Sequence, residues 1–444
     1  MKKVGGQLPL LAYISANRLG HQAWETIMHC SYASSKGRRL IVLLSPGVVN
    51  KAFYVLNSDR VRFIYLPCWL PCVLGAKQAT SSTMKAHLKS VLRLALGKAA
   101  VDRLKQVKRV LRLGSQSEVE GEVSFSLASP AEFRWSDDSA GRLFDRLTLK
   151  TPSLRSAPFR ESKSGTRDGP QYYDYPLART HFRPQRIQRR FVERGETLLG
   201  NLGLSPSDWY VCLHARESSS MGDTTGEYRN QEINNCIPAI EHIRSLGGYV
   251  IRMGDPSMKP LSSMSGTVDY AHSKYRSSFA DLYLCSRARF FIGCTSGLRN
   301  IVALFEKPML DLNVYPLSPL DVSPKSLTIF KRVYSENEER YISLREMLED
   351  PTLYFRFRDA EYRDAGLRIV ENTPLEILRA VQEMLGFLSE DPEFTVWTPE
   401  QHLFLTRIGE VLVSLQRRGM GDEVSQFYPG AVCRIGSSYY HENW

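Results

Sequence analysis

Short apolar runs alternate with helical stripes in the first part of the chain. Three apolar runs, 10–15, 40–44 and 61–66, have the length and residue content of buried strands. A turn at Asn17–His21 is followed by a helical pattern that continues to Cys30. Because strands that alternate with helices are typical of a parallel sheet, we expect a Rossmann-like α/β domain here.

The same alternation returns after Gly200. The predicted strands are Trp209–Leu213, Tyr249–Met253, Phe290–Gly293 and Pro308–Leu312, and the predicted helices are Gln185–Gly200, Ile233–Leu246, Phe279–Ser286 and Ser296–Phe305. Two such halves predict an α/β fold with two Rossmann-like domains that face a cleft.

Breaks in the pattern suggest the domain boundaries. Residues 1–195 form the expected N-terminal, acceptor-side domain, which includes a basic amphipathic helix at 77–113 and an irregular segment at 115–170. Residues 196–330 form the donor-side domain. Residues 331–444 contain the helical patterns Pro374–Leu388 and Pro399–Arg418 and are expected to form a C-terminal helical extension.

Positive charge is concentrated in one segment. The 444 residues carry a net charge of +11, and between Lys77 and Gly114 ten Lys and Arg residues face a single acid, Asp102. Apolar residues recur there at helical spacing, so 77–112 is expected to bind an anionic membrane surface. A domain helix with a solvated basic face is the alternative, and nucleic acid ranks third because no nucleic-acid module surrounds the segment.

Cysteine spacing gives no sign of a metal site. Eight cysteines are scattered, two of them inside apolar runs, and the one close pair, Cys68 and Cys72, has no second pair to complete a zinc site. Buried free thiols are typical of a reducing compartment. We therefore expect a cytoplasmic protein, peripheral on the inner face of the cytoplasmic membrane, with no metal and no cofactor.

Two predicted strands end in basic residues. The run His214–Glu217 follows the strand 209–213, and Arg252, Gly254 and Asp255 end the strand 249–253. Ligands of open α/β sheets bind beyond the carboxyl ends of strands, where an arginine can hold a diphosphate with two hydrogen bonds. We expect Arg216 and Arg252 to bind phosphate beside His214; an interdomain ion pair is the alternative for Arg216.

A third strand runs into small residues. Thr295, Ser296 and Gly297 follow the strand 290–293 and begin a helix, where free N–H groups and hydroxyls form an anion site. A plain N-cap is the more common use of such a turn. An Asp-x-Asp pair, the usual sign of a metal that binds a diphosphate, does not occur in the sequence. Positive side chains are therefore expected to neutralise the diphosphate leaving group without a metal.

The remaining candidates are polar residues between these strands and on the first loop. Asp269 could hold a ribose, Tyr270 could stack on a base, and Asn230 could close over the sugar. An inverting transfer also needs a base within hydrogen-bond reach of the acceptor hydroxyl. The candidates for that base are His21 beside Gly20, Glu25, Glu217 and Asp174, and a cap or surface contact is the alternative for each.

Taken in order, these runs resemble a bacterial family of glycosyltransferases associated with surface polysaccharide clusters. The similarity is strongest over 205–315, and 18–21 and 434–438 also look similar. More distantly, the His-x-Arg run and the Ser-Gly turn look like the fucosyltransferase superfamily of GT-B folds. There the arginine contacts the donor phosphate, which implies that role for Arg216. Glu217 stands where those enzymes often carry further Arg or Asp, so the resemblance leaves the donor sugar open.

The sequence thus predicts a glycosyltransferase that moves a hexosyl or related sugar from a nucleotide diphosphate-sugar to a cell-surface polysaccharide or glycolipid. One alternative keeps the fold and changes the reaction to nucleotide-sugar epimerisation. Another has no catalysis, and treats the chain as a basic adaptor for membranes or nucleic acid.

Overall fold

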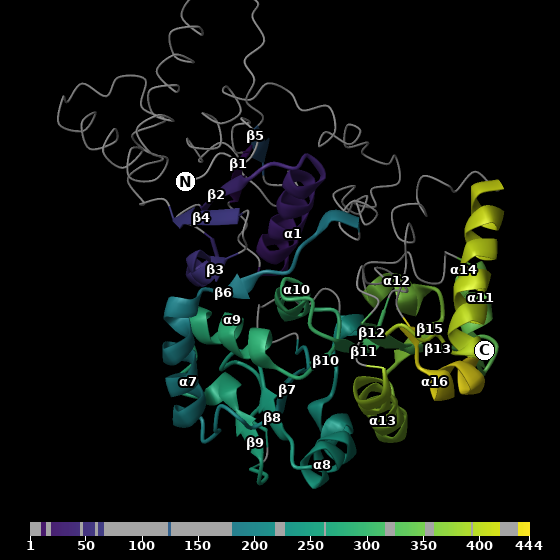
Figure 1. The fold of residues 1–444 in the computed structure, drawn as a ribbon. Helices are drawn as coiled ribbons and strands as arrows, with labels where there is room; N and C mark the ends of the chain where they lie inside the picture. The colour runs from purple at the N-terminus through teal and green to yellow at the C-terminus, as the bar shows by residue number, and fades with distance from the viewer. Residues whose placement is uncertain are drawn as a thin grey trace, which may run out of the picture. The chain divides into compact units, whose positions relative to one another are not determined.

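The chain is described here from a computed structural model. The described residues are 10–14, 19–44, 48–57, 61–65, 123–125, 180–217, 227–261, 263–315, 325–350, 359–391, 394–417 and 434–444. They belong to two compact units, Met1–Tyr172 with His181–Arg183 and Tyr173–Thr180 with Pro184–Trp444. Figure 1 draws the helices and strands of both units as a ribbon. The basic segment 77–113, Asp174 and all of 115–170 except 123–125 lie outside the described residues.

The first unit contains a four-stranded parallel sheet with the order β4-β2-β1-β5. Helix α1 (Leu19–Ser35) packs against β1 and β2 and buries Ile27 and Met28. The sequence pattern did not predict β5, which pairs in parallel with β1 from within the stretch expected to be irregular. The strands are β1 (Leu10–Ile14), β2 (Leu40–Leu44), β4 (Val61–Tyr65) and β5 (Val123–Phe125).

The second unit is built on a seven-stranded parallel sheet with the order β16-β12-β11-β10-β7-β8-β9. Numbered along the chain from β7, the first six strands have the 3-2-1-4-5-6 order of a doubly wound Rossmann sheet. The strands are β7 (Tyr210–His214), β8 (Tyr249–Arg252), β9 (Thr267–Asp269), β10 (Phe291–Gly293), β11 (Met309–Val314), β12 (Ser326–Phe330) and β16 (Arg434–Ile435). This confirms the predicted α/β class.

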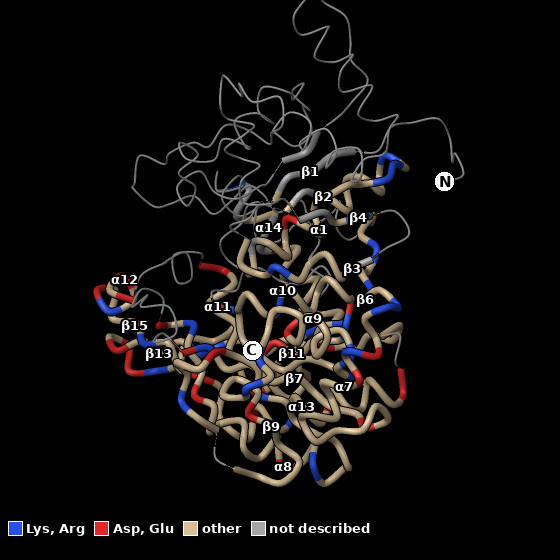
Figure 2. The backbone as a smooth tube through the Cα atoms, turned by 90° about the vertical axis from the view of Figure 1, so that its left-hand side faces the viewer, with Lys and Arg blue, Asp and Glu red and all other residues tan. Residues whose placement is uncertain are grey.

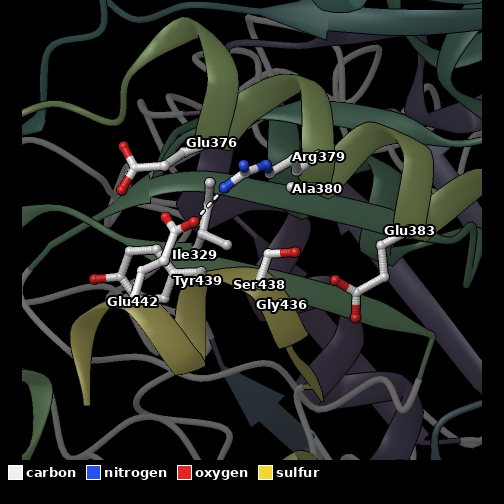
Figure 3. Close-up of a pocket in the computed structure, with 9 residues that line it drawn as sticks. All are labelled: Ile329, Glu376, Arg379, Ala380, Glu383, Gly436, Ser438, Tyr439 and Glu442. Carbon is white, nitrogen blue, oxygen red and sulfur yellow. Dashed lines mark hydrogen bonds and ion pairs between the residues drawn. The ribbon is translucent and has the colours of Figure 1, made fainter.

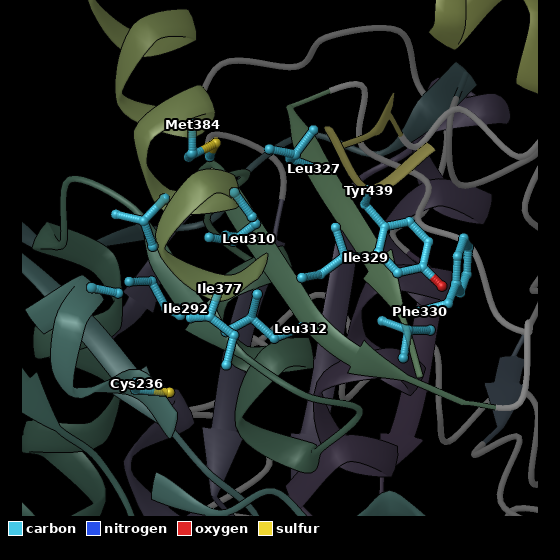
Figure 4. Close-up of a cluster of buried hydrophobic side chains, with 14 of the residues drawn as sticks. Cys236, Ile292, Leu310, Leu312, Leu327, Ile329, Phe330, Ile377, Met384 and Tyr439 are labelled. Atoms are coloured by element: carbon cyan, nitrogen blue, oxygen red, sulfur yellow. The ribbon is translucent and has the colours of Figure 1, made fainter. Parts of the chain in front are cut away.

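Two sets of helices bury the strands. On one side α8 (Ile237–Ser245) packs on α13 (Pro374–Glu390), and α13 covers β11 and β12. Alternate strand residues such as Leu310, Leu312 and Ile329 meet Ile377 and Met384 there, as Figure 4 shows. The other set consists of α7 (Val192–Asn201), α9 (Ser278–Arg287) and α10 (Gly297–Ala303), where α9 packs on both of the others.

Helix α7 begins later than the sequence pattern predicted. Residues 186–191 form the short strand β6 (Arg186–Ile187) and the 3-10 turn η3 (Arg189–Phe191). The backbone N–H of Gln185, just before β6, donates to the carbonyl of Leu304, the residue that follows α10, at 2.7 Å.

The segment after residue 330 is more than a helical extension. It also forms an antiparallel sheet in the order β14-β13-β15, and its last strand, β16, completes the parallel sheet. These strands were missed because they are short and interrupted by turns. The elements are β13 (Arg332–Ser335), β14 (Arg340–Ile342), α11 (Leu344–Glu349), α12 (Asp359–Asp364), β15 (Leu367–Val370), α14 (Pro399–Arg417) and α16 (Ser437–Asn443).

Charged residues of both signs are interspersed over the second unit, including the region of α12, β13 and β15 (Figure 2). Within the parts of the chain that the structure describes, no helix has the length and apolar character needed to cross a bilayer.

Candidate functional site at the switch point of the sheet

The strand order of the second unit reverses between β7 and β10. In an open α/β sheet, the crevice outside the carboxyl ends of two such strands is where ligands bind. The parallel register pairs His214, the last residue of β7, with Gly293, the last residue of β10. Arg216 and the Thr295–Gly297 turn, which follow these two strands, therefore lie at the same edge of the sheet.

Arg216 is half-buried and held by the loop that follows the 3-10 turn η5 (Glu227–Arg229). Its Nη1 donates to Oδ1 of Asn230 at 2.5 Å, and its carbonyl accepts from the N–H of Gln231 at 3.0 Å. The structure thus brings together Arg216 and Asn230, two of the predicted donor-binding residues, through a side-chain bond, and a backbone bond to the next residue, Gln231, holds the same loop.

Lys331 belongs to the same cluster and was missed in the sequence. It directly follows β12, and its Nζ donates to the carbonyl of Asn230 at 2.5 Å and lies 3.9 Å from Oε1 of Glu371. Burial lowers the pKa of this ammonium, whose side chain is 3% exposed. The signal that could have found it is the pattern of Arg216: a cation placed just after a run of strand-forming residues, here Leu327–Phe330.

Carboxylates from the last part of the chain fix the loop that carries Asn230. Asp359 accepts from the N–H groups of Glu227 and Tyr228 at 3.0 and 2.8 Å. Glu371 accepts from the N–H of Glu232 at 2.8 Å. The loop 227–232 is therefore fastened at both ends to the segment that includes α12 and β15.

Two sets of hydrogen bonds, both made by Arg299, hold the Thr295–Gly297 turn in place. Oγ of Ser296 accepts from the N–H of Arg299 at 3.4 Å as the N-cap of α10, a helix of seven residues. Arg299 in turn donates from Nε and Nη2 to the two carboxylate oxygens of buried Asp311, both at 2.7 Å. Since the Ser296 hydroxyl is used in capping and α10 is short, Arg216 rather than this helix start is the stronger anion-binding group.

The His214 side chain is buried at the carboxyl edge of the sheet and does not face an open crevice. It is 7% exposed, and its Nδ1 is 3.2 Å from the carbonyl of Met253. Burial lowers its pKa to about 4, and the nearby cations Arg252 and Arg216 act in the same direction. His214 is therefore neutral at pH 7 and joins the ends of β7 and β8.

Arg252 does not point into a crevice, which corrects the expectation of a second phosphate-binding guanidinium. It is fully buried, and its Nη atoms lie 3.3 Å from Oε1 of Glu217 and 3.2 Å from Oδ1 of Asp269. Glu217 and Asp269 also accept the N–H groups of Lys259 and Leu261 at 3.0 and 2.9 Å. The three charged residues thus fix the loop 255–261 over the ends of the strands.

Tyr270 is likewise corrected, because a fully buried ring cannot stack on a nucleotide base. Its hydroxyl donates to Oδ1 of Asp281 at 2.8 Å. Gly254 has a φ of +151°, and a Cβ there would lie 2.3 Å from Sδ of Met258, so glycine is required for the turn. Asp255 accepts from the N–H of Ser257 at 2.9 Å and closes that turn.

The predicted residues of the first unit lie on α1. Gly20 and His21 are in its first turn, and the surroundings of the His21 side chain are outside what the structure describes. Glu25 is 2% exposed and faces the interior of its unit, so it is poorly placed to take a proton from a sugar acceptor. The roles assigned to Gly20 and His21 stay predictions.

A small hollow between α13 and α16 does not fit a sugar nucleotide. It encloses about 10 Å³, the room that one water molecule needs. The carboxylates that line it are engaged, since Glu383 accepts from Ser437 and Glu442 from Arg379, as Figure 3 shows for the second pair. Among the described residues, no group of three or more His, Cys, Asp or Glu side chains could hold a metal ion.

Comparison with known proteins finds similarity among solved structures. No protein-family model matches the chain. No curated protein matches it either. E. coli ADP-heptose LPS heptosyltransferase II is 10% identical with a TM-score of 0.44, and the match covers 86% of this chain and 100% of that one. A glycosyl transferase family 9 protein from Veillonella parvula is 9% identical with a TM-score of 0.40, covering 72% and 85%.

A third similar structure is the fucosyltransferase NodZ from Bradyrhizobium. It is 13% identical with a TM-score of 0.28, and the match covers 69% of this chain and 95% of that one.

Proposed function

We propose that this protein is a glycosyltransferase that binds a nucleotide diphosphate-sugar at the carboxyl edge of β7 and β10 and passes the sugar to a glycan or lipid-linked acceptor of the cell surface. The observation that carries the proposal is the position of Arg216. It lies half-exposed at the switch point of a doubly wound sheet, beside the small-residue turn 295–297.

The proposed chemistry breaks the bond between the anomeric carbon and the oxygen of the β-phosphate. The acceptor oxygen forms the new bond, a base takes its proton, and the nucleoside diphosphate leaves with the electron pair. Arg216 stabilises the negative charge that develops on that leaving group. Because Glu217 is tied to Arg252 and Glu25 is buried, His21 is the better candidate for the base.

Binding and turnover measurements test the proposal. The purified protein is expected to bind one of UDP, ADP, GDP or CDP in calorimetry and to release that diphosphate from a sugar donor. Arg216→Ala should reduce affinity and turnover by at least about tenfold, which corresponds to roughly 1.4 kcal/mol. Arg289→Ala is the matched control. Arg289 precedes β10 at the opposite edge of the sheet, where its guanidinium lies 4.7 Å from the Trp209 ring centroid.

Three outcomes would contradict the proposal in different ways. Equal losses in the Arg216 and Arg289 variants would remove the phosphate role of Arg216. The absence of binding to every nucleoside diphosphate would remove the transferase itself. Conversion of the donor sugar to an isomer without any acceptor would indicate an epimerase on the same fold.

The proposed membrane association rests on the basic segment 77–112, which lies outside the described residues. Pelleting with vesicles rich in phosphatidylserine at rising salt tests it, because screening weakens attraction between exposed charges. Absent binding, or binding that salt does not change, would contradict this part of the proposal.

A further inference from the structure

Two cations reach the same asparagine from strands that are far apart in the chain. Arg216 follows β7 and bonds the Asn230 side chain, while Lys331 follows β12 and bonds the Asn230 carbonyl, each at 2.5 Å. In the sheet, β10 and β11 stand between these two strands. Asn230 therefore connects the ends of β7 and β12 across the carboxyl edge.

The position of Lys331 is set by the small antiparallel sheet. Its N–H donates to the carbonyl of Val314 at 3.1 Å, which fixes the chain at the end of β11. The register pairs Arg332 with Val370, so Lys331 and Glu371 are the next residues on either side. The lysine thus reaches Asn230 from the point where the parallel sheet and the antiparallel sheet are joined, between β12 and β13.

Nearby carboxylates only partly neutralise this ammonium. Oε1 of Glu371 is 3.9 Å away, and its Oε2 accepts the N–H of Glu232. Both oxygens of Asp359 accept N–H groups of the loop. Among the residues that the structure describes, the Asn230 carbonyl is the oxygen that accepts a hydrogen bond from Nζ of Lys331. A buried ammonium costs free energy, and a methionine would fill the same space without that cost.

We propose that Lys331 is a positioning residue of the donor site: by holding the Asn230 loop, it fixes the direction in which the Arg216 guanidinium presents its N–H groups. This inference rests on the proposed function, in which Arg216 binds the diphosphate. Preorganisation of this kind raises affinity because the guanidinium need not be ordered when the ligand arrives.

Calorimetry with the nucleoside diphosphate that the wild-type protein binds, and with the matching monophosphate and nucleoside, provides the test. Lys331→Met is expected to weaken diphosphate binding about tenfold, the order of one lost charge-assisted hydrogen bond. Nucleoside binding should stay unchanged. Lys331→Gln keeps one donor for the Asn230 carbonyl and should lose less, and it serves if the methionine variant does not fold.

Lys307 supplies the matched control. It is half-buried, and burial lowers its pKa, but it precedes β11 at the amino edge of the sheet. Lys307→Met should leave diphosphate binding unchanged. A loss equal to that of Lys331→Met would mean that any buried lysine of this sheet has the same effect, and would overturn the inference.

A double variant separates positioning from direct contact. In Asn230→Ala the side-chain link to Arg216 is gone, so adding Lys331→Met should cause no further loss of diphosphate affinity. Fully additive losses would show that Lys331 acts without Asn230, which contradicts the relay. If the wild-type protein binds no diphosphate, or Arg216→Ala binds as well as wild type, the proposed function fails instead.

Discussion

Nη1 of Arg216 lies 2.5 Å from Oδ1 of Asn230, a residue 14 positions further along the chain. An asparagine oxygen carries no net charge, so it orients a guanidinium without placing a negative charge beside it. A carboxylate at the same place would neutralise the guanidinium charge and compete with the ligand.

The first prediction follows from this pair. Asn230→Ala should weaken binding of a nucleoside diphosphate about tenfold, and Asn230→Asp should weaken it more, because a fixed carboxylate competes with the diphosphate. Asn234→Ala, at an exposed position of the neighbouring 3-10 turn, is the control that should bind normally. Calorimetry decides the order, and an aspartate variant that binds as tightly as wild type would refute the competition argument.

The sequence predicted those features of the site that depend on neighbouring residues along the chain. Arg216 and Ser296 could be placed at one edge because each follows an apolar run, and parallel strands bring their carboxyl ends together. Lys331 could not be placed, since its partner is a backbone carbonyl in a loop 101 residues earlier. Only the folded chain brings these two segments together.

The misplaced residues have a physical reason as well. Arg252 is the last residue of β8 and Tyr270 directly follows β9, but the direction of a side chain depends on what packs around it. The carboxylates Glu217, Asp269 and Asp281 turn both residues inward. Residue type and spacing do not reveal which arginine becomes fully buried and which stays partly exposed.

The second prediction concerns two glycines of α7. A Cβ on Gly195 would lie 1.8 Å from Cε2 of Tyr283 on α9, so Gly195→Ala forces the two helices apart. We expect it to lower the free energy of unfolding by about 1–3 kcal/mol. Gly200→Ala meets nothing within 4 Å and should raise it by up to about 1 kcal/mol. Urea unfolding measures both, and the same sign for both variants would contradict the packing argument.

The third prediction is a loss of stability in mild acid. Burial holds the pKa of His214 at about 4 against 6.5 for the free side chain. Between these values the unfolded chain binds a proton that the folded chain excludes, so stability falls as the pH drops from about 6.5 to about 4. The loss attributable to His214 amounts to roughly 3 kcal/mol at the low end.

His214→Asn provides the comparison, because an asparagine can keep a donor for the Met253 carbonyl but does not titrate. Urea unfolding at several pH values between 7 and 4 should show a smaller loss in the variant than in wild type. His29, whose pKa burial lowers to about 3, acts in the same sense but is present in both proteins. Parallel curves for the two proteins would show that His214 is not the titrating group.

The fourth prediction concerns the ion pair that holds the Thr295–Gly297 turn in place. Arg299→Met removes two hydrogen bonds of 2.7 Å from Asp311, which is 1% exposed, and leaves a carboxylate inside the protein. The expected loss is about 3 kcal/mol of unfolding free energy. Replacing both partners by apolar residues, as in R299M/D311L, should cost less than the single change, since no buried charge remains.

The control for this ion pair is Arg345 with Glu349. That pair also has a bond of 2.9 Å, but its side chains are more than half exposed, so Arg345→Met should change stability by less than about 0.5 kcal/mol. Thermal and urea unfolding of the variants decide between burial and contact distance as the cause of the stabilisation. If the double variant at 299 and 311 is less stable than the single one, then the pair itself, rather than the buried carboxylate that remains in Arg299→Met, determines the cost.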